Sequence, residues 1–126
     1  MIRPALAAAA LALAGCAPTE SDEADLRSLA EARPVGEPVD CIETSRISRT
    51  RVRGDQAIDF HLRSGEVFRN TLRNRCPGLG FEDSFTYRAS IGKLCSVDFI
   101  TVINNSGGQG PSCGLGSFQR IETAAR

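Results

Sequence analysis

The sequence is poor in the residues that most chemistry uses. Its 126 residues contain no tryptophan, one tyrosine, one lysine and a single histidine. Beyond the N-terminus there is no apolar run of about 18 residues, no Gly-X-Y repeat and no sustained heptad, which excludes a multi-span membrane protein, a collagen and a coiled coil. The length indicates one domain.

The N-terminus has the parts of an export signal. Arg3 supplies the positive charge, residues 5–13 form a short apolar stretch, and small residues follow. The ending Leu13-Ala14-Gly15-Cys16 resembles the lipobox of bacterial lipoproteins. This resemblance implies that residues 1–15 are a signal peptide and that Cys16 carries lipid. Ala17 in place of an aspartate implies the outer membrane, with the protein facing the periplasm. An ordinary signal peptide or a short buried helix is the alternative.

Charge divides the rest of the chain. Residues 17–40 contain seven acids and two arginines, residues 41–75 contain four acids and eight arginines, and residues 76–126 contain four of each sign. An acidic tether over residues 16–40 is therefore expected before a domain whose first half is basic. Leu26 and Leu29 could give one short helix within residues 21–32 a thin apolar stripe, but a flexible spacer fits this composition better.

From Cys41 onward the pattern is typical of short strands. Ile58, Phe60 and Leu62 alternate with Asp59, His61 and Arg63, so the apolar set is expected inward and the polar set outward. Further strands are expected at residues 41–52, 66–72, 85–91, 97–103 and 115–121, with a glycine-rich loop at residues 104–112. About six strands predict an all-β domain over residues 41–121, a small antiparallel barrel or sandwich, followed by a tail at residues 122–126.

Four cysteines remain once Cys16 is assigned to lipid: Cys41, Cys76, Cys95 and Cys113. An even number in an exported small domain favours two disulfides. The rival is a zinc site, but gaps of 35, 19 and 18 positions contain no Cys-x2–4-Cys knuckle, so neither metal nor cofactor is expected. Three pairings are possible. A simple up-and-down order of strands favours Cys41–Cys95 with Cys76–Cys113, and a strand crossover would remove that argument.

Candidate chemistry is sparse. His61 is the one available imidazole, and solvated polar alternation explains its position without catalysis, so we expect no enzyme. Residues 107–109 read Gly-Gly-Gln, the tripeptide of release factors, but the stretch at residues 106–111 is interpreted as a mobile hairpin loop.

The arginines are a more unusual feature of the sequence than these motifs. Arg49, Arg51 and Arg53 share one face of an extended strand, after Arg46, and such a face can bind phosphate or carboxylate groups. In the periplasm the available anions are lipid or lipopolysaccharide phosphate and peptidoglycan carboxylate, whereas nucleic acid is not expected. The alternatives are that the arginines solubilise the sheet, or that the acidic tether folds over them.

Several short motifs resemble a family of small proteobacterial envelope proteins without an assigned function. The most distinctive is Arg75-Cys-Pro-Gly-Leu79, and the resemblance covers about residues 41–121, including Cys41-Ile42, Leu94-Cys95 and Cys113-Gly-Leu. It implies a cysteine-paired β domain and no established activity, so it assigns no functional residue.

A second resemblance concerns Ser64-Gly-Glu-Val-Phe68, which is similar to the Ser-Gly-x-x-Tyr element of periplasmic lysozyme inhibitors. Phe68 replaces the tyrosine, and a Thr-Lys-Gly partner motif is missing. The expected function is a non-enzymatic lipoprotein of the outer membrane that binds or supports an envelope component. The alternative is an inhibitor of an envelope hydrolase such as lysozyme.

Overall fold

The computed structural model describes residues 32–89 and 91–122, which are mostly β and contain one short α-helix. Three sequence predictions fall on residues that the structure does not describe. They are the lipid on Cys16, the short helix within residues 21–32, of which only Ala32 is described, and residues 123–126 of the tail. The described strands are β1 (Arg33–Pro34), β2 (Cys41–Glu43), β3 (Ile47–Val52), β4 (Ala57–Leu62), β5 (Val67–Thr71), β6 (Phe85–Tyr87), β7 (Lys93–Cys95), β8 (Phe99–Ile103), β9 (Gln109–Gly114) and β10 (Phe118–Glu122).

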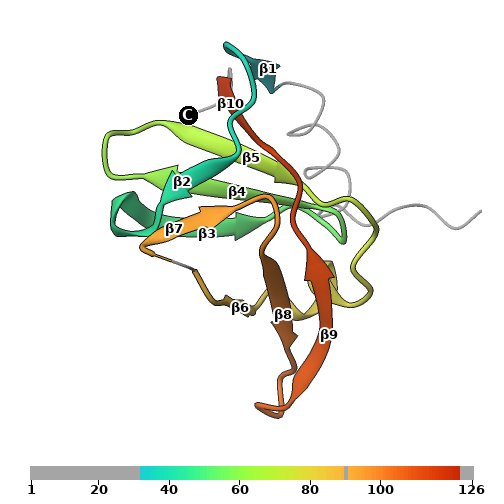
Figure 1. Cartoon of the computed structure of the whole chain (residues 1–126). Coiled ribbons are helices and arrows are strands. Elements are labelled where there is room, and N and C mark those ends of the chain that lie inside the picture. Colours follow the sequence, from blue (N-terminus) through green and yellow to red (C-terminus); the bar gives the residue numbers. More distant parts are fainter. Residues whose placement is uncertain (1–31, 90, 123–126) are drawn as a thin grey trace, which may run out of the picture.

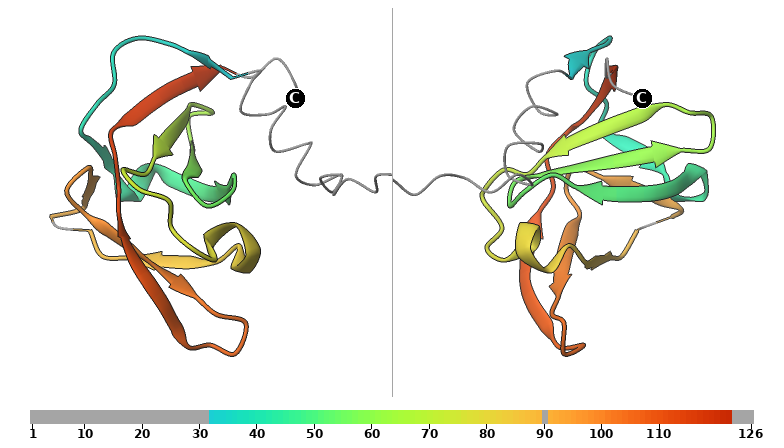
Figure 2. Two further views of the ribbon diagram at one scale, coloured as in Figure 1. Left: turned by 90° about the vertical axis from the view of Figure 1, so that its right-hand side faces the viewer. Right: turned by 180° about the vertical axis from the view of Figure 1, so that it is seen from behind.

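These strands form three antiparallel sheets: β1-β10-β5-β4-β3, β2-β7 and β6-β8-β9 (Figure 1). Strands β9 and β10 follow one another along one side of the molecule, so the chain passes there from the three-stranded to the five-stranded sheet (Figure 2). The sheets do not close into one barrel. The all-β prediction with two disulfides is confirmed.

The core forms where the apolar faces of the sheets meet. Ile58, Phe60 and Leu62 are buried, which confirms the alternation expected for β4. The ring of Phe60 meets Phe118 of β10 and Phe85 of β6 edge-on, with ring centroids 5.5 and 6.4 Å apart. Aromatic pairs of this geometry add about 0.5–1.5 kcal/mol to the gain from burial, so Phe60 links the five-stranded to the three-stranded sheet.

The disulfides are Cys41–Cys95 and Cys76–Cys113, with Cα atoms 4.0 and 5.8 Å apart. They are the pairs that the up-and-down order favoured, yet the strand order is not up-and-down, because β10 lies between β1 and β5. Cys41 and Cys95 are direct partners in the β2–β7 ladder, and Cys76 ties the segment after β5 to β9. Spatial proximity of segments distant in the sequence, rather than a meander, therefore produces the pairing.

Three local expectations were wrong. The glycine-rich loop expected at residues 104–112 is shorter, because Gln109–Gly114 forms β9 and pairs with β8. The strand expected at residues 41–52 is interrupted by the 3-10 helix η1 (Thr44–Arg46), so β2 and β3 belong to different sheets. Ordered pairing also begins before Cys41, since Pro34 pairs with Ile121 and Val39 bridges to Phe118.

The Arg75–Leu79 motif has a structural role. Gly78 adopts φ +84° and starts the short helix α2 (Leu79–Glu82), whose Leu79 is fully buried. The carboxylate of Asp55, in the β3–β4 turn, accepts hydrogen bonds from Arg75 Nε at 2.9 Å and from the Gly80 amide at 2.8 Å. These contacts and the Cys76 disulfide hold the turn, the helix and β9 together.

A buried amide fixes the bend between β9 and β10. Asn70 is fully buried; its Nδ2 donates to the Gly116 carbonyl at 2.7 Å, and its Oδ1 accepts from the Gly116 amide at 2.8 Å. The side chain thus replaces a strand partner where the ladder is interrupted, and both polar groups of Gly116 are satisfied.

Candidate functional site

The candidate site is the face of the five-stranded sheet that points away from the core cluster, here called the outer face. Directly paired residues share a face of a sheet. The register therefore places two rows there: Pro34, Ile121, Val67, His61 and Arg49 in one, and Gln119, Arg69, Asp59 and Arg51 in the other. Arg53 joins them from the end of β3, where its amide donates to the Ala57 carbonyl.

A buried ion cluster lies at the centre of the outer face. Asp59 is 1% exposed, and its Oδ1 accepts from Arg69 Nε at 2.7 Å. Its Oδ2 accepts from Arg69 Nη2 at 2.9 Å and from Arg53 Nε at 3.0 Å. The expectation that Asp59 points into solvent was wrong, because paired guanidinium groups satisfy both oxygens and allow the carboxylate to be buried.

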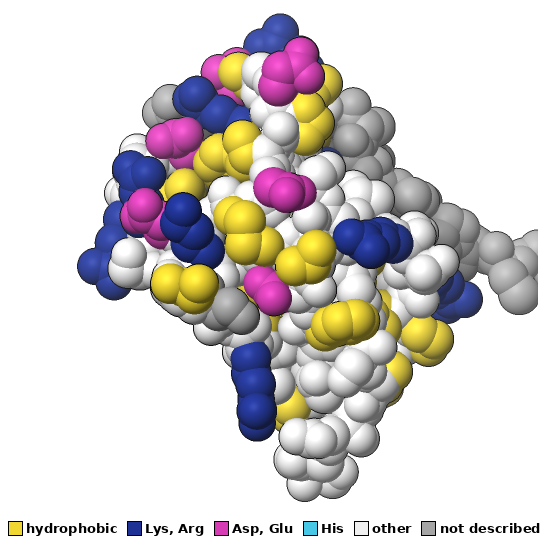
Figure 3. Space-filling view, viewed as in Figure 1, with side chains coloured by type: hydrophobic (Ala, Val, Ile, Leu, Met, Phe, Trp, Pro, Cys, Tyr) yellow, Lys and Arg dark blue, Asp and Glu magenta, His cyan; other side chains and the backbone are white. Residues whose placement is uncertain are grey.

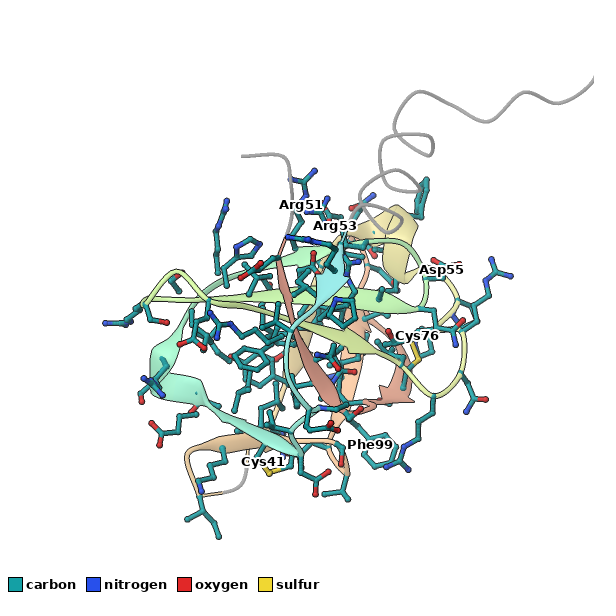
Figure 4. The ribbon with its side chains drawn as sticks, turned by 90° about the horizontal axis from the view of Figure 1, so that it is seen from above. Cys41, Arg51, Arg53, Asp55, Cys76 and Phe99 are labelled. Atoms are coloured by element: carbon teal, nitrogen blue, oxygen red, sulfur yellow. A yellow bond between two sulfur atoms is a disulfide. The ribbon has the colours of Figure 1, made fainter. Side chains whose placement is uncertain are left out.

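The three candidate arginines therefore do not behave alike. Arg49 and Arg51 are exposed and lie across from His61 and Asp59 on β4. Arg53, by contrast, has a side chain only 10% exposed and bound to Asp59, so it is part of the fold. Figure 4 shows Arg51 and Arg53 at one side of the molecule and Cys41 and Phe99 at the other. Among the residues that the structure describes, Arg49 and Arg51 form no ion pair.

His61 lies between these groups. Burial is the largest cause that lowers the pKa of His61 from 6.5, and the positive charge of Arg49 comes next, while Asp59 opposes them. Its Nε2 is buried and has no hydrogen-bond partner among residues 32–89 and 91–122. Ser48 Oγ donates to the backbone carbonyl of His61. Burial and the neighbouring guanidinium group of Arg49 thus favour the uncharged form of the ring.

Two hollows lie elsewhere on the molecule. One, of about 290 Å³, has an apolar floor that includes Ile42, Leu62 and Phe68, and a rim with two acids and two bases: Glu43, Glu66, Arg46 and Lys93. Figure 3 shows acidic and basic side chains alternating along the left edge, near β2, β7 and the β4–β5 turn. A rim of balanced charge gives no preference for an anion.

The second hollow, of about 660 Å³, is lined by residues in or next to β6, β8 and β9, including Tyr87, Arg88 and the exposed ring of Phe99. Thr101 and Ser112 share a hydrogen bond of 2.9 Å on this side of β8 and β9. The surface is polar and open, so it lacks the enclosed apolar shape that small-molecule sites usually have.

Two of the sequence motifs do not belong to the outer face. The turn at residues 63–66 joins β4 to β5, and Ser64 Oγ contacts Glu66 Oε1 at 3.1 Å. In the Gly-Gly-Gln stretch, Gly107 adopts φ +83° in the β8–β9 turn, and its amide donates to the Asn104 carbonyl. Gln109 already belongs to β9. Both stretches are hairpin turns.

Val67 and Ile121 were not recognised from the sequence as members of this site, and the pairing of Arg69 with Asp59 was not predicted. A signal for Arg69 existed: a tight turn at Ser64-Gly65 pairs Leu62 with Glu66, and the same register places Asp59 opposite Arg69. Ile121 had no such signal, because β10 reaches β5 only through a long-range contact.

Within residues 32–89 and 91–122, no group of three His, Cys, Asp or Glu side chains could hold a metal ion. No helix in the described part of the chain is long and apolar enough to cross a membrane.

Comparison with known proteins adds a family without a functional assignment. A protein-family model of unknown function matches residues 1–125. No curated protein matches the chain, and no solved structure matches it.

Proposed function

Since the chain belongs to a family of unknown function, DUF6491, we propose a function from its own residues: a non-enzymatic lipoprotein, anchored through Cys16 to the outer membrane, whose outer face binds phosphate groups of the envelope surface. The observation that carries the proposal is the pair Arg49 and Arg51, exposed on one strand face and without an acidic partner among the described residues. Guanidinium groups bind phosphate with two parallel hydrogen bonds.

The anchor supports phosphate over other anions. Two or three acyl chains on Cys16 would hold the domain stably at the membrane, where phosphate groups are dense. Basic side chains near an anionic membrane surface contribute about 1 kcal/mol each. Peptidoglycan carboxylates are the competing anions, and they require a separate test.

The first experiment uses the chain with Cys16→Ser, so that lipid cannot hold it to vesicles. We expect it to co-sediment with vesicles of equal phosphatidylglycerol and phosphatidylcholine at 50 mM salt, and much less at 300 mM. Arg49→Gln with Arg51→Gln should weaken binding several-fold. The matched control, Arg88→Gln with Lys93→Gln, removes the same charge from positions outside the five-stranded sheet and should bind like the wild type.

Equal loss in both double variants would show a general charge effect and refute a site at Arg49 and Arg51. Binding to isolated peptidoglycan but not to vesicles would indicate that the ligand group is a carboxylate and not a phosphate. Mass spectrometry of the membrane-bound protein tests the anchor: an unmodified Cys16 would refute the lipoprotein assignment.

Inhibition of an envelope hydrolase such as lysozyme is the second candidate. Exposed Ser64 and Gly65 in the β4–β5 turn favour it, because a short projecting turn can enter a cleft. Stoichiometric inhibition that is lost in Ser64→Arg and retained in Arg49→Gln with Arg51→Gln would support the inhibitor. Absence of inhibition at excess protein would exclude this candidate for the hydrolase tested.

A further inference from the structure

The outer face combines two surfaces that need different partners. Ile121 is 7% exposed and lies beside Val67 and Pro34, which makes one end apolar. Arg49 and Arg51 make the other end positive. A ligand that is only a phosphate group would use one end of this face, whereas an acidic segment with apolar residues would use both.

Part of this face is more buried than expected for one side of a solvated sheet. Ala57 and Ile121 are each less than a tenth exposed although their register directs them away from the core cluster, whereas Arg49 and Arg51 on the same face are exposed. The contacts of β1, β10, β5, β4 and β3 with other described strands run mainly along their own sheet. Such low exposure is typical of a covered surface.

The sequence contains one segment with the matching chemistry. Residues 20–31 include five acids, Glu20, Asp22, Glu23, Asp25 and Glu31, against the single base Arg27, together with Leu26 and Leu29. The segment directly precedes β1, which pairs with β10 at one edge of the five-stranded sheet. Four strand spacings of about 4.8 Å separate β1 from β3, and a few residues of about 3.3 Å each cover that distance.

We propose that residues 20–31 of this chain bind across the outer face, with their acids toward Arg49 and Arg51 and their leucines toward the Ile121–Val67 end. An anionic ligand must then displace the segment before it reaches the arginines. The binding of the segment stands by itself, whereas the competition rests on the proposed function.

Fluorescence tests the binding of the segment. The chain has no tryptophan, so Leu29→Trp in the Cys16→Ser chain introduces a single reporter. We expect acrylamide to quench it at least threefold less efficiently than the control Thr19→Trp, which lies outside the segment. Adding Arg49→Gln and Arg51→Gln, or 500 mM salt, should raise the quenching toward the control. Equal quenching of both reporters would overturn the proposal. Protection of Leu29→Trp that does not change when Arg49 and Arg51 are replaced would overturn it too.

Vesicle binding tests the competition separately. Neutralising Glu20, Asp22, Glu23 and Asp25 to their amides should tighten binding to phosphatidylglycerol vesicles several-fold. The matched control neutralises Glu37, Glu43, Asp83 and Glu122, four exposed acids of the described domain, and changes the net charge equally. Equal tightening in both variants would reject the competition. If the Leu29→Trp reporter is protected from quenching but the chain binds no vesicle, the proposed function is refuted. The binding of residues 20–31 to the outer face is then still supported.

Discussion

The carboxylate of Asp59 lies between the guanidinium groups of Arg53 and Arg69, and all three side chains are at most 10% exposed. At the residue scale, this cluster distinguishes the arginines that stabilise the fold from those that remain at the surface. A buried carboxylate needs counter-charges and hydrogen bonds, and Arg53 and Arg69 supply them. Arg49 and Arg51 remain at the surface, where their charge is screened over about 8 Å at physiological salt.

Asp59→Asn should destabilise the protein by about 3–5 kcal/mol, because it leaves two largely buried guanidinium groups without their carboxylate. Urea unfolding followed by circular dichroism measures this loss. The comparison is Arg33→Gln, which breaks the exposed Arg33–Glu122 pair and should cost less than about 1 kcal/mol. A cost below 1 kcal/mol for Asp59→Asn would mean that the cluster does not stabilise the fold.

His61 predicts a dependence of stability on pH. Its pKa in the folded protein is below the usual 6.5, chiefly because of burial and then Arg49. The unfolded chain therefore binds the proton more readily, and the stability from neutral His61 is present above pH 6.5 and lost as the pH falls through that value toward the folded pKa. His61→Gln should flatten the stability curve just below pH 6.5. An unchanged slope in this variant would assign the dependence to other groups.

At the scale of elements, the join between β9 and β10 determines how two sheets share one chain. The Asn70 amide binds both polar groups of Gly116, and a Cβ built on Gly116 would overlap the carbonyl oxygen of Thr71. Because that neighbour is backbone, it cannot rotate aside as a long side chain could. The bend therefore requires glycine for space at this position.

Gly116→Ala should lower the unfolding free energy by about 1–3 kcal/mol through this overlap, a typical cost of overpacking. Asn70→Ala should cost a similar amount, about 1–3 kcal/mol, because it leaves the buried amide and carbonyl of Gly116 unpaired. Thermal melts measure both. Gly108→Ala is the control, since its nearest neighbours are side-chain atoms at 3.6 and 3.9 Å, and it should change stability little.

At the scale of the whole molecule, two disulfides join segments that lie far apart along the chain. Cys41–Cys95 spans 54 positions and Cys76–Cys113 spans 37. Small domains bury too little apolar surface for high stability, and cross-links of this length restrict the unfolded chain. The bridges thus complement a core built from several short strands.

Reduction should therefore lower stability by about 2–5 kcal/mol for each bridge lost. Thiol labelling of denatured, unreduced protein should detect no free thiol among the four domain cysteines. Chemical unfolding with and without reductant gives the energy, and the Cys16→Ser background removes the remaining thiol from the count. Four reactive thiols with one bound zinc would contradict the disulfide assignment.

The sequence by itself determined the features that depend on local pattern and composition. Period-two alternation identified β4 and its buried Ile58, Phe60 and Leu62, and four cysteines without a zinc knuckle indicated two disulfides. Alternation works because neighbouring side chains on a strand point to opposite faces, whatever the strand pairs with.

Only the tertiary structure decided which faces are covered and which strands are partners. Asp59 alternates like a solvated residue, yet Arg53 and Arg69 allow its burial. Residues 109–112 read as a loop, yet pairing with β8 makes Gln109–Gly114 a strand. The β10–β5 pairing creates the outer face from residues far apart in the sequence. The physical reason is that partner, register and burial are set by long-range contacts, which a local pattern does not encode.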